Sequence, residues 1–546
     1  MQASEPKGGY TELIDESSNE IKEQSGEQLS GRKKQKGASD RELLEENLTV
    51  EAQLFKNPKL AVKIFEYMGG GGKYQGAVIA AAVFAHFCIG FTVGLLSISA
   101  TAPTTTCSKE ASPHQFLPCP ESEACSLIKS GRGKVEFEYP TWTERYGMYC
   151  DNQLKRNFYK SLFILMMTFL VFFALQCADY IGRRVCFYIT FILCGGGAVL
   201  CHFVDNFGWK VVMLGAANAA YIIYAGLFTF YLSECTSPKS FLFRNIVAGW
   251  KIAEPLGYLA FCLITIFTKN PDVLSFITMV AIVIALGVPC LFCVESPQFL
   301  LENYQIDKML AVIDHIRKFN SKPENNDLKI EIYHDATIWV AEERAKSQTR
   351  AKPISPLWRV LTNKLYLYQV VALSSILFLL ENLYFGVAMN LNSMGTSSTS
   401  LNGILVALVQ LLSSILVILN SKNMSRRRWL LILQSSLIFC GIFLVLVTYM
   451  AESLTKKLII AILSIVLVSG LINAAATPFY HYNSELFPVE LRGTGNCLVN
   501  VIANTLSMST PFLTMTSSGL GLHPLVGCCV VAVISTPLTY FLRNTV

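Results

Sequence analysis

The chain has 546 residues, of which 52% are hydrophobic and 15% charged, and its formal net charge is +6. Soluble domains carry about a quarter of their residues as charged side chains, so this composition excludes an ordinary soluble fold. The net charge says little about partners, because the placement of Lys and Arg around apolar segments carries more information than their sum. Nothing in the chain indicates nucleic acid binding.

Residues 1–75 are polar and carry charges of both signs. Early acidic residues, such as Glu5 and Glu12, argue against a cleaved signal peptide and against an acid-poor mitochondrial presequence. We expect this segment to be a largely disordered cytosolic tail. The glycines of 69–72 would act as a hinge between the tail and the first apolar segment.

From Gly76 onward, apolar runs recur, each long enough to cross a hydrocarbon core of roughly 30 Å as a helix. We predict twelve transmembrane spans. They lie near 76–100, 159–179, 185–205, 210–232, 243–268, 272–294, 366–390, 400–420, 428–450, 457–480, 495–517 and 522–542.

Two long segments, 101–158 and 295–365, separate these spans unevenly. The second of them divides the chain into six spans, a linker and six more spans. We therefore expect an N-terminal bundle in 76–294 and a C-terminal bundle in 366–546, arranged around a central cavity.

The basic residues between the spans predict the orientation. With the N-terminus inside, the short cytosolic loops hold nine Lys and Arg residues and the short external loops hold four. This asymmetry follows the positive-inside rule and places both termini in the cytosol. The nine are Arg183, Arg184, Lys239, Arg244, Lys422, Arg426, Arg427, Arg428 and Arg492, and the four are Lys210, Lys269, Lys456 and Lys457.

The 101–158 segment is then external and contains an even set of cysteines, which would form disulfides in an oxidising space. Three pairings are possible, and four free thiols are the alternative. The set is Cys107, Cys119, Cys125 and Cys150.

The 295–365 segment begins with an amphipathic helical pattern that includes Met309, Ile313 and Ile316. We expect its helices to lie under the two bundles on the cytosolic side.

Short motifs stand at the junctions between predicted spans. The second span ends in 175–184, which follows the pattern Gly-x-x-x-Asp-basic-x-Gly-basic-basic at most positions. The run 295–300 closes the first half, and the runs 485–488 and 492–495 lie between the tenth and eleventh spans. In this order, the motifs resemble those of the major facilitator superfamily and, within it, the organic cation/anion/carnitine transporter family of solute carriers.

The resemblance covers most of residues 76–542 and implies an all-α integral membrane protein with the twelve-helix fold of that superfamily. Some positions depart from the pattern. Leu175 stands where a Gly is expected, Tyr180 where a basic residue is expected, and Asn423 where the second-half copy has Asp. These departures predict a weakened gate.

The loop motif places a carboxylate and two guanidinium groups at a helix end, where they pair with a facing helix in one transport state only. The resemblance therefore implies a set of gating residues at the span junctions. Its members are Asp179, Gly182, Arg183, Arg184, Glu234, Glu295, Glu485 and Arg492.

Carriers of this design bind solute near the midplane between the two halves. Counting from Arg492, Asn504 falls where the resemblance implies a charged residue in many members. A neutral amide leaves the charge of the solute open and mildly favours a zwitterion or a neutral solute. A hydrogen bond between helices explains Asn504 equally well.

Glu381 lies in the seventh span, and Tyr384, Phe385 and Asn390 after it resemble the substrate-facing segment of the family. A carboxylate in a span is costly unless it faces a wet cavity or a partner. Glu381 is therefore a candidate site for a cation or a proton. The alternative is that it lies near the external interface and is simply solvated.

Two further features of the spans have a functional and a structural interpretation. Tyr221, Tyr224 and Phe228 share a face of the fourth span, where they would cage an organic cation or pack against another helix. Lys251 and Glu254 share a face of the fifth span and can neutralise each other. A pair of this kind that faced the cavity would instead bind a zwitterion.

We see no phosphate-binding loop, no metal-ligand spacing and no nucleophile with a partnered base, so we expect no enzyme and no cofactor. The predicted function is the transport of a small organic ion or zwitterion across the lipid bilayer by alternating access, with a coupling ion left open. The alternatives are a non-transporting scaffold or sensor and a sugar-type facilitator. The plasma membrane is the expected location.

Overall fold

The long apolar segments form helices, because a chain in lipid must pair its backbone N–H and C=O groups within each segment. The computed structural model describes residues 58–109, 112–119, 121–138, 140–236, 241–349, 356–394, 398–420, 425–450, 453–487 and 489–542. All of them fall within one unit, Phe55–Val546.

Every predicted span of the first half corresponds to a long helical segment. The third span is continuous through a π-helical turn, and the fifth contains a proline. The segments are α4 (Lys73–Ser99), α7 (Gln153–Ile181), α8 (Arg183–Thr190) with η3 (Phe191–Gly195) and α9 (Gly196–Phe203), α10 (Phe207–Cys235), α11 (Phe241–Phe267) and α12 (Pro271–Phe292).

The second half repeats this arrangement. Its fourth span also contains a π-helical segment, and its fifth is broken in two. The segments are α17 (Lys364–Met389), α18 (Thr399–Asn420), α19 (Arg426–Thr448), α20 (Leu454–Ala461) with η5 (Ile462–Ser469) and α21 (Gly470–Leu486), α22 (Val489–Ser507) with α23 (Thr510–Gly519), and α24 (Leu525–Tyr540). Within the described ranges, nine spans are long and apolar enough to cross a membrane by length and composition alone.

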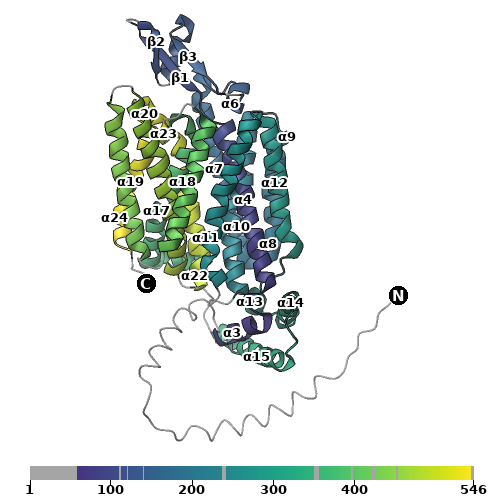
Figure 1. Cartoon of the computed structure of the whole chain (residues 1–546). Coiled ribbons are helices and arrows are strands. Elements are labelled where there is room, and N and C mark those ends of the chain that lie inside the picture. Colours follow the sequence, from purple (N-terminus) through teal and green to yellow (C-terminus); the bar gives the residue numbers. More distant parts are fainter. Residues whose placement is uncertain are drawn as a thin grey trace, which may run out of the picture. The chain divides into compact units, whose positions relative to one another are not determined.

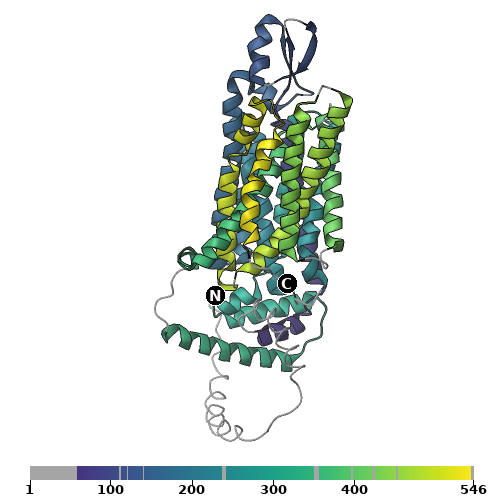
Figure 2. The same ribbon diagram turned by 90° about the vertical axis from the view of Figure 1, so that its left-hand side faces the viewer.

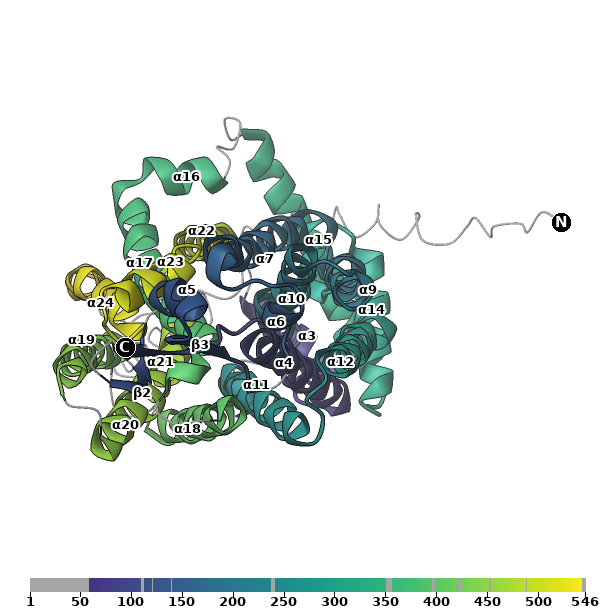
Figure 3. The same cartoon turned by 90° about the horizontal axis from the view of Figure 1, so that it is seen from above.

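The twelve spans form two bundles, seen end-on in Figure 3. Helices α4, α7, α10, α11 and α12 pack together in one bundle, and α17, α18, α19, α21, α22 and α24 in the other. The bundles meet along two seams, where α11 packs against α18 and α7 packs against α22.

The segment between α4 and α7 contains a small sheet at one end of the bundles (Figure 1). It has the strand order β2-β1-β3 with antiparallel pairing, and disulfides join Cys107 to Cys119 and Cys125 to Cys150. The sequence left these pairings open. The elements are β1 (Thr104–Lys109), β2 (Ser112–Pro118), α5 (Glu121–Leu127), η1 (Ile128–Ser130), β3 (Gly133–Glu136), α6 (Trp142–Arg145) and η2 (Cys150–Asn152).

This disulfide-bonded segment contacts both halves. The Glu138 carboxylate accepts hydrogen bonds from Ser398 Oγ at 2.8 Å and from the backbone N–H of Thr399, at the start of α18, at 2.6 Å. Asn392, after α17, donates to the carbonyl oxygen of Ala102 at 2.9 Å. These bonds hold the two halves together at the end of the bundles that carries the sheet.

The other end of the bundles carries the helices of the linker (Figure 2). Helix α14 buries Met309, Ile313 and Ile316, the apolar positions that predicted it. The short helix η4 (Leu391–Ser393), in the turn between α17 and α18, lies instead at the end that carries the sheet. The linker helices are α13 (Pro297–Glu302), α14 (Ile306–Phe319), α15 (Asn326–Thr349) and α16 (Pro356–Thr362).

The predicted disordered tail, residues 1–75, includes an ordered helix, because residues 58–68 form α3 (Pro58–Met68). Its apolar face buries Ile64 and Phe65, and α3 packs against α14 and α15. Lys63 pairs with Glu331 and Asp335, each at 2.5 Å. Tertiary packing therefore orders a short helix that is marginal by itself. Residues 1–57 lie outside the described residues.

Candidate functional site

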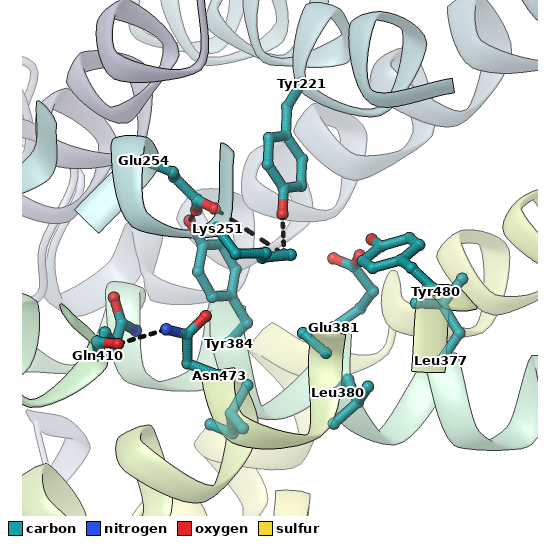
Figure 4. A pocket seen from close by; sticks show the side chains of 12 residues that line it. Tyr221, Lys251, Glu254, Leu377, Leu380, Glu381, Tyr384, Gln410, Asn473 and Tyr480 are labelled. Carbon is teal, nitrogen blue, oxygen red and sulfur yellow. Dashed lines mark hydrogen bonds and ion pairs between the residues drawn. The ribbon is translucent and has the colours of Figure 1, made fainter. Parts of the chain in front are cut away.

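Helices from both bundles line a central cavity (Figure 4). The first half contributes Tyr221 from α10 and Lys251 and Glu254 from α11. The second half contributes residues of α17, α18 and α21. These are Leu377, Leu380, Glu381, Tyr384, Gln410, Ile472, Asn473, Ala476 and Tyr480.

A close helix crossing positions the charged residues of α11. A Cβ on Gly257 would lie 1.8 Å from the carbonyl oxygen of Phe87 in α4, and one on Gly90 would lie 2.5 Å from the carbonyl oxygen of Glu254. Only glycine allows the two backbones to approach so closely. This contact fixes the depth and rotation of the Lys251–Glu254 turn.

Pro255 leaves one backbone carbonyl of the same turn without a donor in its own helix, so that this carbonyl bonds to the other half. Its ring nitrogen has no hydrogen, so the carbonyl of Lys251, four residues earlier, loses its donor within the helix. Ser414 Oγ of α18 donates to that carbonyl at 3.0 Å, and Asn473 of α21 donates to Ser414 Oγ at 2.6 Å. A proline in α11 is thus compensated by polar side chains of the second half.

The Lys251 ammonium lies among aromatic rings and a carboxylate. It donates a hydrogen bond to the Tyr221 hydroxyl and lies 5.1 Å from the centre of that ring. It also lies 5.0 Å from the ring centre of Tyr480, on α21. Glu254 Oε2 is 4.0 Å from Lys251 Nζ, so the predicted pair is a loose contact inside the cavity.

The two carboxylates of the cavity differ in their partners. The Tyr384 hydroxyl donates to Glu254 Oε1, which joins α17 to α11 across the interface between the halves. Within the described residues, no hydrogen bond or ion pair engages the Glu381 carboxylate, which points into the same space as Lys251. Glu381 is therefore the acceptor most available to a solute.

The cavity contains one ammonium and two carboxylates, with a formal charge of −1 when all three are ionised. Its free volume is about 30 Å³, room for about two water molecules. An organic solute therefore requires the lining side chains, or the two halves, to move apart. Among the described residues, no group of three or more His, Cys, Asp or Glu could hold a metal ion.

Of the predicted solute-binding residues, Glu381, Tyr384 and Tyr221 line this cavity. Glu381 lies within α17 and is only 8% exposed, which does not agree with the alternative of a solvated residue at the interface. The predicted aromatic stripe splits in two: Tyr221 faces the cavity, and the rest packs inside the first half.

Five predicted residues lie elsewhere. Tyr224 donates to the carbonyl oxygen of Leu286 at 2.9 Å, and Phe228 packs on Phe187. Phe385 contacts Phe163 of α7 between the two halves. The Asn390 amide caps the end of α17, and Asn504 donates to the Asn500 carbonyl within its own helix. None of the five lines the cavity, so we leave them out of the proposed site.

The predicted gating residues of the first half meet at the linker end of the bundles. Arg183 Nη2 donates to Glu234 Oε1 at 2.7 Å, and Glu295 Oε1 accepts from the backbone N–H of Arg183 at 2.8 Å. Gly182 has a φ of 99°, and a Cβ there would lie 2.4 Å from Glu295 Oε2. The backbone N–H of Arg184 also faces Glu295.

The side chains of Asp179, Glu485 and Arg492 lie outside the described residues. Five residues therefore define the described part of the predicted gating set: Gly182, Arg183, Arg184, Glu234 and Glu295. The contacts named above join the α7–α8 junction to α10 and to the start of the linker.

Sequence reasoning missed Gln410, Asn473 and Tyr480 as cavity residues, and it gave Lys251 and Glu254 both a structural and a solute-binding interpretation. A signal was present for the two amides, because polar side chains in apolar spans are costly unless they face a cavity or a partner. Neither residue belongs to a motif, so only the packing of α18 against α21 brings them to the site.

A family model and one curated relative match this chain. The family described as sugar (and other) transporter matches residues 78–542. Solute carrier family 22 member 6 of Rattus norvegicus is 25% identical over 255 residues, which cover 46% of this chain and 44% of that protein. The match thus spans less than half the length of this curated relative.

Solved structures show the same fold. The xylose transporter XylE from E. coli, in a partially occluded inward-open conformation, covers 86% of this chain and 98% of its own, with a TM-score of 0.58 and 14% identity. The human organic anion transporter MFSD10 (TETRAN) covers 85% of this chain and 99% of its own, with a TM-score of 0.50 and 10% identity. These identities establish a common architecture and say nothing about the solute.

The family match covers most of the chain, and the two bundles have the architecture of these carriers, so the predicted all-α membrane fold is confirmed. The chain therefore belongs to the sugar (and other) transporter family of the major facilitator superfamily, a family of multi-pass membrane transporters.

Proposed function

We propose that this chain transports a small organic cation, or a zwitterion with a cationic group, by alternating access around the central cavity. The observation that carries the proposal is the pair of buried carboxylates, Glu254 and Glu381, contributed by opposite halves and flanked by the rings of Tyr221, Tyr384 and Tyr480. Tyrosine rings and carboxylates together are the groups that attract an organic ammonium.

The charge of the cavity favours a cationic group over an anion. Two carboxylates and one ammonium leave a deficit of one positive charge, and a charge buried in a membrane protein is costly unless it is paired. A bound monovalent cation would neutralise the cavity. An organic anion would add a third negative charge beside Glu254 and Glu381.

The placement of the carboxylates suits a carrier. A solute that contacts both Glu254 and Glu381 bridges the two bundles, so its binding biases how the halves sit against each other. The Arg183–Glu234–Glu295 cluster at the linker end would form and break as that end closes and opens. We further propose that the protein works at the plasma membrane, with both termini in the cytosol.

The test is uptake into proteoliposomes that contain the purified protein, from a panel of radiolabelled organic cations, carnitine-like zwitterions, organic anions and hexoses. We expect saturable uptake of a cation or zwitterion. Glu381→Gln should raise its KM by about tenfold to a hundredfold, the equivalent of ~1.5–3 kcal/mol for a contact with a charged group. Glu123→Gln, an exposed site in α5, is the matched control and should behave as wild type.

Saturable uptake of anions or hexoses alone would contradict the proposed solute class. Uptake that is the same for Glu381→Gln as for wild type would refute the cavity. If the folded protein transports nothing in the panel, the alternative of a membrane scaffold or sensor replaces the carrier.

A further inference from the structure

The Lys251 side chain occupies the part of the cavity best suited to an organic ammonium. Its Nζ lies 5.1 Å and 5.0 Å from the ring centres of Tyr221 and Tyr480, and 4.0 Å from Glu254 Oε2. Two aromatic faces and a carboxylate around one ammonium are the features of a cation cage. Here the cation in the cage belongs to the protein.

The cage is shared between the halves. Tyr221 and Lys251 come from the first half, whereas Tyr480 comes from α21 of the second half (Figure 4). The Lys251 ammonium therefore bridges the two bundles, as a bound solute would. The free volume of about 30 Å³ leaves no room for an organic ammonium beside it.

We infer that Lys251 is a tethered cation, which occupies the cationic subsite of the empty carrier and must leave it before a cationic solute binds. This inference rests on the proposed function and names the residue that sets the affinity of the site. The solute ammonium would take the position between Tyr221, Tyr480 and Glu254, with Glu381 facing the same space, and the Lys251 ammonium would withdraw from that position.

Lys251 also gives the empty carrier a means of returning. Without a cation, Glu254 and Glu381 would leave two uncompensated carboxylates in a narrow site, and moving the halves around them would be costly. With Lys251 in the cage, one of these charges is compensated in the absence of solute. The wild-type protein should therefore perform net uptake as well as exchange.

The test measures binding of radiolabelled tetraethylammonium to the full-length protein in nanodiscs. Lys251→Met removes the ammonium. Lys251→Gln removes the charge but keeps a hydrogen-bond donor for Tyr221, so this second variant still tests the inference if Lys251→Met fails to fold. Both variants should bind tetraethylammonium at least about tenfold more tightly than wild type. Lys155→Gln, an exposed lysine near the start of α7, is the matched control and should bind as wild type.

A second readout follows the return step. In proteoliposomes, the ratio of exchange to net uptake of the cation should rise at least about tenfold in Lys251→Gln. The reason is that the two halves of this variant change their orientation readily only when the cation is bound. A merely structural role for Lys251 would lower both rates together and leave the ratio unchanged.

The outcomes separate this inference from the proposed function. If wild type binds the cation and the monodisperse Lys251 variants bind it equally or more weakly, the tethered-cation inference is overturned and the proposed function stands. If Lys251→Gln binds tetraethylammonium and wild type does not, Lys251 occupies the cationic subsite as inferred, and the uptake panel decides separately whether the wild-type chain transports a cation. If neither binds any cation of the panel, both fall.

Discussion

A buried ion pair anchors the disulfide-bonded segment to α7, and its removal should loosen that segment strongly. Glu121 on α5 accepts from Arg156 Nη2 at 2.7 Å and from Nη1 at 3.1 Å. Its Oε1 also accepts from the backbone N–H of Cys150 at 2.9 Å. The two side chains are only 7% and 3% exposed, so water cannot replace either partner.

Glu121→Ala would leave the Arg156 guanidinium buried without its counter-charge. Breaking a buried pair in this way costs about 3–5 kcal/mol. We expect residues 121–150 to open locally more often, so their backbone hydrogen exchange should accelerate by at least about two orders of magnitude. Replacing both partners by methionine should recover most of the loss, because an apolar pair of similar volume leaves no charge unpaired.

The assay is hydrogen exchange with mass spectrometry on the purified protein in nanodiscs, with thermal unfolding as a second measure. Glu123→Ala removes an exposed carboxylate two residues away on the same helix and serves as control. Equal exchange rates in Glu121→Ala and Glu123→Ala would refute the reasoning. So would a Met–Met double variant less stable than Glu121→Ala alone.

Two further predictions concern the helix crossing beside the cavity and the contact between α3 and α14 at the linker end. Gly257→Ala should reduce the yield of folded protein several-fold, because the added Cβ would lie 1.8 Å from the Phe87 carbonyl oxygen. Gly76→Ala is the control and should be neutral, because nothing lies within 4 Å of a Cβ there. Size-exclusion profiles measure the yields, and equal yields for the two variants would contradict the prediction. Burial alone would raise the pKa of Asp314, but hydrogen bonds from Lys329, Tyr67 and Arg317 hold this pKa below its usual value. The stabilisation is therefore present above pH ~4 and is lost as pH falls through the lowered pKa. Asp314→Asn should accelerate hydrogen exchange in α3 at pH 7, and the wild-type rate should approach that of the variant in acid. Identical exchange rates of wild type and variant at pH 7 would show that the contact of Asp314 with Tyr67 does not stabilise α3.

The sequence alone was sufficient for the fold, because lipid imposes a simple rule. Runs of apolar residues must become helices, and the placement of long polar segments at 101–158 and 295–365 divides those helices into two sets. The helix α14 was also predictable, since its apolar residues recur with the helical period. Helix α3 was not, because it is ordered by its contacts with α14 and α15.

The cavity was predictable only in part. Glu381 was identified because a carboxylate in a span has a high cost unless something faces it. Asn504, chosen by its place in a resemblance, does not line the cavity, and its amide donates to the Asn500 carbonyl in its own helix, so its role in solute binding stays a prediction. Tyr221 and Tyr224 share a helix face in sequence, yet one lines the cavity and the other bonds inside the first half.

The sequence by itself therefore determined the membrane architecture, the number of spans and the elements that carry charged residues. Only the tertiary structure decided which polar groups meet, because that depends on the rotation and depth of each helix against the others. The glycines 90 and 257 set this geometry for α11, and Ser414 and Asn473 complete it from the other half. Lys251, Glu254 and Glu381 share one cavity because contacts between distant segments bring them there.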